Sequence, residues 1–247
     1  MRFEGRVAVV TGASREGQMG AVLAEAFGRE GARVVVTART AANVERVAGR
    51  LARDGVDALA VAADLATEAG AAELARRVDA RFGRVDVLVN LAGGLTRVGP
   101  AMELSLADFE REMASNLVTA FLVTRAIVPL MRRAGGGRIV NFSSLAAAEP
   151  GARMLAYNCA KAGVTALTRT LALELREYGI AVNAVAPGLI DTEANLAAMA
   201  PSDEERARRW VTRQEIAEAT LFLASDAASG VNGQVLAVTG KGFRGGA

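Results

Sequence analysis

Short apolar runs rich in β-branched residues alternate along the whole chain with segments of helical periodicity. The first run, Arg6–Gly12 (RVAVVTG), is bounded by glycines and is typical of a buried strand. A glycine-bearing loop, Gly12–Gly20, follows it, and apolar residues at helical spacing then extend to Gly31. A second β-branched run, Arg33–Ala38, comes next, so the pattern predicts a strand–loop–helix–strand unit at the start of the chain.

The same alternation continues to the end of the chain. Further strands are expected at Val56–Ala62, Val85–Val89, Gly137–Ser143, Ile180–Val185 and Gln234–Val238, and helices at Thr40–Asp54, Thr67–Arg81, Ser105–Arg133, Met154–Tyr178, Glu193–Arg209 and Thr212–Ser225. Seven strands that alternate with helices predict the α/β class, as a doubly wound parallel sheet with helices on both faces. No linker or repeat interrupts the pattern, so residues 1–247 are expected to form a single Rossmann-fold domain.

Residues suited to ligand binding follow the ends of the expected strands. These positions are Gly12–Gly20, Ala38–Arg39, Asp64, Asn90–Gly93, Ser143–Ser144 and Pro187–Thr192. In an open parallel sheet the carboxyl ends of the strands share one edge, which is where ligands bind. The glycine loop before the first helix would let the backbone approach a pyrophosphate at the helix N-terminus. A nucleotide site at this edge is therefore expected.

Composition removes several classes of chemistry. The chain has no His and a single Cys, which excludes Ser-His-Asp and Cys-His catalysis, His-ligated metals and thiolate zinc sites. The expected site therefore contains no metal. The net charge of +2 comes from interspersed charges, so no nucleic-acid partner is expected.

The sequence also predicts a cytoplasmic protein. Glu4 and Arg6 occupy the region where a signal peptide would be apolar. The richest apolar stretch, Leu117–Met131, is broken by Arg125 and Pro129, so no membrane segment is expected. The single Cys159 is in keeping with a reducing compartment.

A tyrosine and a lysine form the most informative pair. Tyr157 and Lys161 lie four residues apart in a predicted helix, so their side chains share one face about one turn apart. Of the 29 Lys and Arg residues only Lys161 and Lys241 are lysines, and only Tyr157 and Tyr178 are tyrosines. An ammonium beside a phenol favours the phenolate, so we expect Lys161 to lower the pKa of Tyr157 for proton transfer.

The chain resembles the short-chain dehydrogenase/reductase family over essentially its whole length, and within it the 3-oxoacyl-acyl-carrier-protein reductase-like branch. The motifs that carry the resemblance, in family order, are TGAS…MG after the first strand, Asp64-Leu65, Asn90-Leu-Ala-Gly, Asn116, Ser144, Tyr157-x-x-x-Lys161 and Pro187-Gly-Leu-Ile-Asp-Thr.

The resemblance implies roles for four catalytic residues. Tyr157 would be the general acid that protonates a carbonyl oxygen, and Lys161 would lower the pKa of Tyr157 and bind the nicotinamide ribose. Ser144 would hold the substrate oxygen, and it is preferred to Ser143 by its spacing from Tyr157. The two serines are not expected to serve together, because neighbours on a strand point to opposite faces. Asn116 would bind a water in a proton relay to Lys161.

The resemblance also implies a nicotinamide cofactor, for which NADP(H) is favoured and NAD(H) is the alternative. An NAD site usually carries an acid at the end of the second strand, whereas this chain has Thr37-Ala38-Arg39, with Arg15 in the glycine loop. Guanidinium groups suit a 2′-phosphate. The expected cofactor-binding residues are Gly12, Ser14, Arg15, Met19, Gly20, Arg39, Asp64, Leu65, Asn90, Ala92, Gly93, Tyr157, Lys161, Pro187, Gly188, Ile190 and Thr192.

The chain departs from the family pattern in four places. The glycine loop is about two residues longer than usual, which leaves Gly17 as the nearest candidate for the middle glycine. Leu91 replaces the usual second Asn, the glycine after Ser144 is missing, and the usual acidic-Gly-Gly near the end reads Thr239-Gly240-Lys241. None of these changes removes a catalytic group.

The expected function is carbonyl–alcohol interconversion on a small molecule, with a 3-oxoacyl thioester that is carrier-protein-bound as one candidate substrate. Arg132 and Arg133 would then meet an acidic carrier. A small alcohol, sugar or polyketide substrate, or a catalytically silent nucleotide-binding regulator, stays open. Residues 193–210 fall where the family has its substrate lid, and helices 105–133 and 154–178 where members form homodimers or homotetramers.

Overall fold

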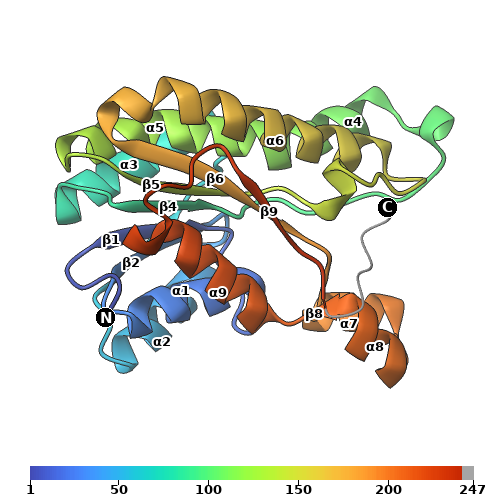
Figure 1. The fold of residues 1–247 in the computed structure, drawn as a ribbon, viewed down its shortest axis with the longest axis horizontal. Helices are drawn as coiled ribbons and strands as arrows, with labels where there is room; N and C mark the ends of the chain where they lie inside the picture. Colours follow the sequence, from blue (N-terminus) through green and yellow to red (C-terminus); the bar gives the residue numbers. More distant parts are fainter. Residues whose placement is uncertain (241–247) are drawn as a thin grey trace.

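Seven parallel strands form the central sheet of the computed structural model, which describes residues 1–240 (Figure 1). The strand order is β3-β2-β1-β4-β5-β6-β9, and every neighbouring pair is parallel. Their bounds are β1 Val7–Thr11, β2 Arg33–Ala38, β3 Ala58–Ala62, β4 Val87–Asn90, β5 Gly137–Phe142, β6 Ile180–Pro187 and β9 Val235–Val238. The order reverses direction between β1 and β4, which is where an open sheet leaves a crevice for a ligand.

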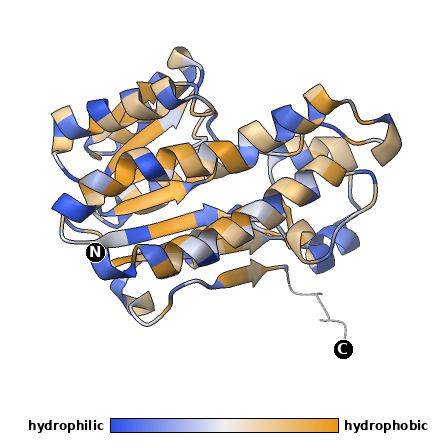
Figure 2. Cartoon of the chain, turned by 90° about the horizontal axis from the view of Figure 1, so that it is seen from above, coloured by the Kyte–Doolittle hydropathy of each residue, from blue (hydrophilic) through white to orange (hydrophobic). Residues whose placement is uncertain are grey.

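Helices cover both faces of the sheet, as the sequence predicted. One face carries α1 (Met19–Arg29), α2 (Ala41–Arg53) and α9 (Arg213–Ala224); the other carries α3 (Glu68–Phe82), α5 (Thr119–Arg133) and α6 (Leu155–Glu174). Side chains alternate between the two cores: Val10 packs with α1 and α9, and Val9 packs with α3 and α5. Both faces of each central strand are therefore apolar, which explains the uninterrupted apolar runs (Figure 2).

The expected helix over 105–133 is not continuous. It consists of α4 (Leu106–Met113), a π turn at Ala114–Val118 and α5. Just after the π turn, the hydroxyl of Thr119, the first residue of α5, donates to the carbonyl of Ala114, five residues back, at 2.9 Å. Single π turns are frequently found at functional sites, and this one contains Asn116.

The expected helix over 193–209 is also divided. It consists of α7 (Glu193–Met199) and α8 (Asp203–Arg209), separated by Ala200 in the left-handed region (φ 41°) and by Pro201. Two short strands that the sequence did not reveal, β7 (Leu189–Ile190) and β8 (Trp210–Val211), close this segment into a separate parallel pair. Single 3₁₀ turns complete the description at Ala101–Glu103, Leu145–Ala147, Arg176–Tyr178 and Asp226–Ala228.

Within residues 1–240, one helical run is long and apolar enough to cross a membrane, Leu106–Arg133, with 28 residues and a mean hydropathy of 1.5 in its richest window. Val123, Ile127 and Met131 of this run are fully buried against the sheet and α3. This burial is that of a core helix. The cytoplasmic location expected from the sequence stays a prediction.

Candidate active site

The carboxyl edge of the sheet brings together side chains from four separate parts of the chain. The loop after β1, the loop after β4, the end of β5 and the first turns of α6 supply the expected site residues. The segment from α7 to β8 lies beyond the same edge (Figure 1).

Tyr157 and Lys161 share one face of α6, as the spacing predicted. The Lys161 ammonium nitrogen lies 5.7 Å from the centroid of the Tyr157 ring. Lys161 is 5% exposed, and its ammonium donates to the Phe142 carbonyl at 2.8 Å. The last residue of β5 therefore fixes the position of the lysine under a half-buried tyrosine.

The two serines after β5 point in different directions. The Ser143 hydroxyl is buried against α6, where it donates to the Lys161 carbonyl at 3.2 Å and bonds the Thr165 hydroxyl at 2.8 Å. The Ser144 hydroxyl accepts from the Ala146 amide and lies near enough to the Tyr157 phenol to act on its pKa. The structure thus brings Ser144, and not Ser143, to the Tyr157 side chain.

The pKa shifts of this pair differ from the sequence expectation. Burial lowers the pKa of Lys161 to about 8, against a smaller raising effect of the Glu112 carboxylate. Burial raises the pKa of Tyr157 above its ordinary value; the Ser144 hydrogen bond lowers it, and the Glu112 charge raises it further. The expectation that Lys161 lowers the pKa of Tyr157 is therefore wrong for this structure, because desolvation dominates.

Asn116 is buried (1% exposed) and is held from two sides. Its amide donates to the carbonyls of Gly94 at 3.1 Å and Glu112 at 3.0 Å, and its oxygen accepts from the Gly94 amide at 3.0 Å. A Cβ on Gly93 would lie 2.4 Å from that oxygen. Only glycine fits there, so the loop after β4 is locked to the π turn.

The glycine loop has the backbone geometry that a dinucleotide requires. A Cβ on Gly20 would lie 2.6 Å from the Gly12 carbonyl oxygen, and a Cβ on Gly12 would lie 3.0 Å from the Ala92 Cα. No side chain caps the N-terminus of α1, whose N-cap residue is Gln18. The first-turn amides of α1 therefore have no side-chain cap, an arrangement that fits a pyrophosphate.

The longer glycine loop is joined to the start of α9 and to Asp191 by contacts that sequence reasoning missed. The Arg213 guanidinium donates to the Gly17 carbonyl and lies 3.4 Å from the Asp191 carboxylate. Asp191 also accepts from the Arg213 amide at 2.9 Å. Gly17 has φ 72°, which favours glycine. No sequence signal marks this contact, because Gly17 and Arg213 are 196 residues apart.

Two arginines stand at the expected adenosine end of the site. Arg39 and Arg15 are both exposed, and neither makes an ion pair with any residue of the described range 1–240. The buried Thr37 hydroxyl at the end of β2 has no hydrogen-bond partner. Both guanidinium groups are thus available to an anionic ligand.

The remaining expected cofactor residues also lie at this edge, and their local contacts differ. The Asp64 carboxylate accepts from the Ala66 amide at 3.2 Å in a turn before α3. The side chains of Met19 and Leu65 are buried in the two cores at 6% and 4% exposure. Any contact of these two residues with a ligand would therefore come from their backbone.

Asn90 ties neighbouring strands together, as the sequence suggested. Its amide donates to the Asn141 oxygen of β5 and to the Thr124 hydroxyl of α5, each at 2.9 Å. The Thr11 hydroxyl accepts from the amides of Leu91 and Ala92 at 3.0 Å and 2.9 Å. These bonds hold the ends of β1, β4 and β5 in register around the loop that contains Gly93.

The segment after β6 lies at the same carboxyl edge of the sheet. Pro187 ends β6, and the Gly188 amide donates to the Val238 carbonyl at 2.9 Å. The Ile190 carbonyl accepts from the side-chain amide of Asn195 at 2.9 Å, while Thr192 caps α7. Ser14, in the glycine loop, donates its amide to the Gly12 carbonyl at 3.0 Å.

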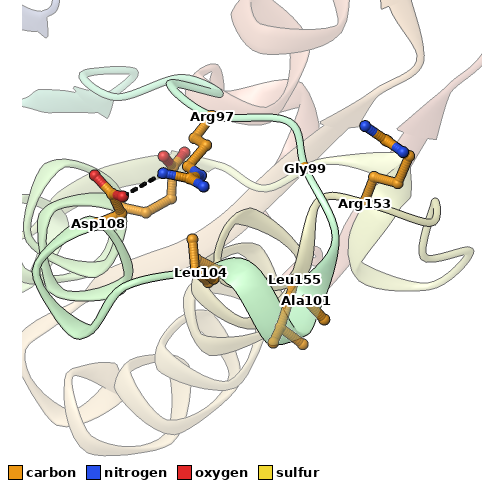
Figure 3. A pocket seen from close by; sticks show the side chains of 9 residues that line it. Arg97, Gly99, Ala101, Leu104, Asp108, Arg153 and Leu155 are labelled. Carbon is orange, nitrogen blue, oxygen red and sulfur yellow. Dashed lines mark hydrogen bonds and ion pairs between the residues drawn. The ribbon is translucent and has the colours of Figure 1, made fainter.

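A small cavity lies between the loop after β4, α4 and the start of α6 (Figure 3). Arg97 and Asp108 form an ion pair of 2.6 Å on one side of it, and Arg153 stands on the other. Glu112, Leu104 and Leu155 also line it. Among the described residues no group of three His, Cys, Asp or Glu side chains is placed to hold a metal.

Comparison with known proteins identifies the family. The family model for short chain dehydrogenase matches residues 6–202. The cis-4-hydroxycyclohexanecarboxylate dehydrogenase of Sinomonas cyclohexanicum is 42% identical, with 96% of each chain covered. The D-threitol dehydrogenase of Mycolicibacterium smegmatis is 38% identical over 97% of this chain and 93% of its own. The 3-oxoacyl-[acyl-carrier-protein] reductase of Escherichia coli is 34% identical over 97% and 98%.

Two solved structures of dehydrogenases are also similar to this chain. A 7α-hydroxysteroid dehydrogenase complexed with NADH and 7-oxo glycochenodeoxycholic acid has a TM-score of 0.89 and 36% identity, covering 97% of this chain and 94% of its own. A protein from Beutenbergia cavernae with bound NADP at low occupancy has a TM-score of 0.86 and 41% identity, covering 96% and 97%. This chain belongs to the short-chain dehydrogenase/reductase family and is an NAD(P)-dependent oxidoreductase acting on CH–OH groups.

Proposed function

We propose that the protein is an NADP(H)-dependent oxidoreductase that interconverts a carbonyl and a secondary alcohol, with Tyr157 as general acid and base. One observation supports this most directly. The half-buried Tyr157 shares its helix face with Lys161 at the carboxyl edge of the sheet, and the nearby Ser144 hydroxyl acts to lower the Tyr157 pKa.

Each catalytic residue has a distinct task in this proposal. Ser144 holds the substrate oxygen beside the phenol, and Tyr157 exchanges the proton with that oxygen. Lys161, fixed to Phe142, binds the ribose and places positive charge under the phenol. Asn116 and the π turn support a water between Lys161 and solvent. A bound nicotinamide supplies or accepts the hydride.

The raised pKa of Tyr157 sets the pH dependence that we expect for the rates of the two directions. A phenol whose pKa lies above its ordinary value is protonated at neutral pH and is ready to act as an acid. Tyr157 can therefore donate its proton for reduction near neutral pH. Oxidation needs the phenolate, so the rate of oxidation should increase as the pH rises. Rates measured in both directions against pH test this sign, and oxidation that slows with rising pH would contradict it.

The preference for NADP(H) rests on Arg39 and Arg15. Both guanidinium groups lack an ion-pair partner within residues 1–240, and no carboxylate follows β2 in the segment Thr37-Ala38-Arg39. A 2′-phosphate would provide a bidentate partner for such a group. The solved relatives bind NADH in one case and NADP in another, so titration of this protein with both cofactors decides the preference.

We propose a secondary alcohol on a hydrocarbon ring or chain, or its ketone, as substrate. The side chains of Val98 and Met102, in the segment after β4, are 58% and 91% exposed, and Leu155 beside Tyr157 is 42% exposed. Exposed apolar side chains in segments that flank the cavity suit a hydrocarbon ring or chain. The relative that acts on a hydroxycyclohexanecarboxylate is also more similar to this chain than the acyl-carrier-protein reductase is.

A 3-oxoacyl thioester is the second candidate, supported by the 34% identical reductase. The positions of Arg132 and Arg133 do not support a carrier-protein docking site for such a thioester. Arg133 pairs with Asp79 at 2.5 Å, and the Arg132 guanidinium lies 3.9 Å from the centroid of the Tyr178 ring. Both arginines end α5 just before β5 begins, so they lie at the opposite edge of the sheet from Tyr157.

A catalytically silent regulator is the alternative from another class. Fluorescence titration with NADPH and NADH, followed by a panel of probes scored by cofactor oxidation, separates the two. The panel contains a cyclohexanone carboxylate, an acetoacetyl thioester and a keto sugar. Turnover with the first probe supports our proposal, turnover with the second alone supports the thioester, and binding without turnover favours the regulator.

We also propose that residues 193–210 act as a substrate lid within a one-domain protein. Neither α7 nor α8 contains a buried residue, and Met199 is 54% exposed. The segment is joined to the body by Asp191, which pairs with Arg206 at 3.6 Å and with Arg213. Slower hydrogen exchange in 193–210 when cofactor and substrate are bound would support a lid.

A homodimer or homotetramer is proposed on the exposed faces of α5 and α6. Val118 and Phe121 are 37% and 44% exposed near the start of α5, and Leu173 is 78% exposed on α6. Apolar side chains on adjacent helices suit a symmetric interface. Light scattering of the purified protein measures the subunit number, and a monomer would refute the proposal.

A further inference from the structure

Glu112 is a buried acid that the proposed reaction does not use. It lies in α4 and is 2% exposed. No ion pair joins it to any residue in the described range 1–240. A buried carboxylate without a cation in contact is costly to desolvate and is rare unless it serves a purpose.

The carboxylate of Glu112 joins two parts of the site. One of its oxygens accepts from both the hydroxyl and the amide of Thr96, the latter at 3.2 Å. Its other oxygen lies 3.4 Å from the amide nitrogen of Asn116. Thr96 belongs to the segment after β4, whereas Asn116 lies in the π turn. Glu112 therefore links the loop after β4, through Thr96, to Asn116 in the π turn.

The charge of Glu112 also acts on the catalytic pair. It is the charged group that raises the pKa of Lys161 against burial, and it raises the pKa of Tyr157 as well. The other charges that face it line the same cavity. Arg97 is paired with Asp108 at 2.6 Å, and Arg153 stands on the segment before α6.

Resting on the proposed function, we propose that Glu112 is a positioning residue of the active site: its buried carboxylate anchors the Thr96 loop to Asn116 and supplies the negative charge that keeps the Lys161 ammonium protonated beneath Tyr157. Without that charge, the buried lysine would lose its proton at a lower pH.

The consequence can be read without substrate or cofactor. The chain contains only two lysines, so a Lys241→Arg background leaves Lys161 as the single signal in a protein labelled with ¹³Cε-lysine. In that background, Glu112→Gln keeps the size and one acceptor oxygen but removes the charge. We expect the NMR titration midpoint of Lys161 to move to lower pH in this variant.

Two controls separate charge from structure. Glu110→Gln removes an equal charge from an exposed position on the same helix and should leave the midpoint unchanged. Thr96→Val removes a hydrogen bond but keeps the carboxylate; it should speed amide exchange around Thr96 with little effect on the midpoint. If Glu112→Gln fails to fold, the double variant Thr96→Val/Glu112→Met is used. It removes both partners of the buried hydrogen bond and puts apolar side chains in their place.

A Lys161 midpoint that is the same with and without the Glu112 charge would overturn the proposal. So would an equal shift in Glu110→Gln, because the effect would then be one of net charge. These titrations use the free protein, so a failure to find turnover on any probe would leave their outcome intact.

Discussion

The ammonium nitrogen of Lys161 lies 2.8 Å from the carbonyl oxygen of Phe142, at the carboxyl end of β5. This contact fixes the lysine to the sheet and keeps it out of solvent. The Tyr157–Lys161 pair is therefore held by a strand end on one side and by α6 on the other.

The buried lysine should make stability depend on pH in a defined direction. The pKa of Lys161 is lowered from 10.5 to about 8, so between these values the unfolded chain binds a proton that the folded protein does not. The free energy of unfolding therefore rises with pH across that window, by about 3 kcal/mol from this group, and its contribution is constant below about pH 8.

Lys161→Met isolates this effect. Urea unfolding of both proteins between neutral pH and about pH 10 should show the wild-type protein gaining stability relative to the variant as the pH rises. Near neutral pH the variant should be at least as stable as the wild type, although Phe142 loses its donor. A stability difference that does not change with pH would mean that the lysine is not desolvated.

Arg39→Ala should weaken NADPH binding far more than NADH binding. A charge-assisted bond to the 2′-phosphate is worth about 1.5–3 kcal/mol, which corresponds to about 10- to 150-fold in the dissociation constant. Fluorescence titration measures both constants. Arg77→Ala, an exposed arginine on α3, is the matched control for loss of charge. Equal losses for the two cofactors would defeat the 2′-phosphate argument.

Two helical glycines should respond oppositely to alanine. A Cβ on Gly20 would meet the Gly12 carbonyl oxygen at 2.6 Å and the Ala13 Cα at 2.7 Å, both on rigid backbone. Gly20→Ala should destabilise the protein by about 1–3 kcal/mol and weaken cofactor binding. Nothing lies within 4 Å of a Cβ on Gly49, in the interior of α2, so Gly49→Ala should stabilise it by about 0.5–1 kcal/mol.

Chemical unfolding and NADPH titration of the two alanine variants give both readouts. Similar losses of stability in both variants would show that the close approach of the glycine loop to α1 is not what requires Gly20.

The sheet was predictable because its strands are buried on both faces. The run Arg33–Ala38 is apolar almost throughout, so its limits are clear in the sequence. Its predicted bounds equal those of β2. The edges were less accurate: β3 begins at Ala58 and β4 at Val87, two residues later than expected, because Val56 and Val85 precede the ladder. The shared face of Tyr157 and Lys161 followed from helical spacing alone.

Features that depend on contacts between distant segments could not be predicted. The π turn around Asn116 depends on Gly94 and Thr119, and the division of the lid helix depends on the left-handed Ala200. The direction of the Tyr157 pKa was missed because a sequence shows that an ammonium is near but not how deeply both groups are buried. Glu112 gave no signal, since its neighbours in α4 are ordinary solvent-facing charges.

The most direct measurement is the turnover of Tyr157→Phe with NADPH and a carbonyl probe that the wild-type protein reduces. Removal of one hydroxyl should lower kcat by about 100- to 10,000-fold while the NADPH dissociation constant stays nearly unchanged. A Tyr157→Phe variant that reduces the same carbonyl at a rate comparable to the wild type would contradict the assignment of Tyr157 as the proton donor.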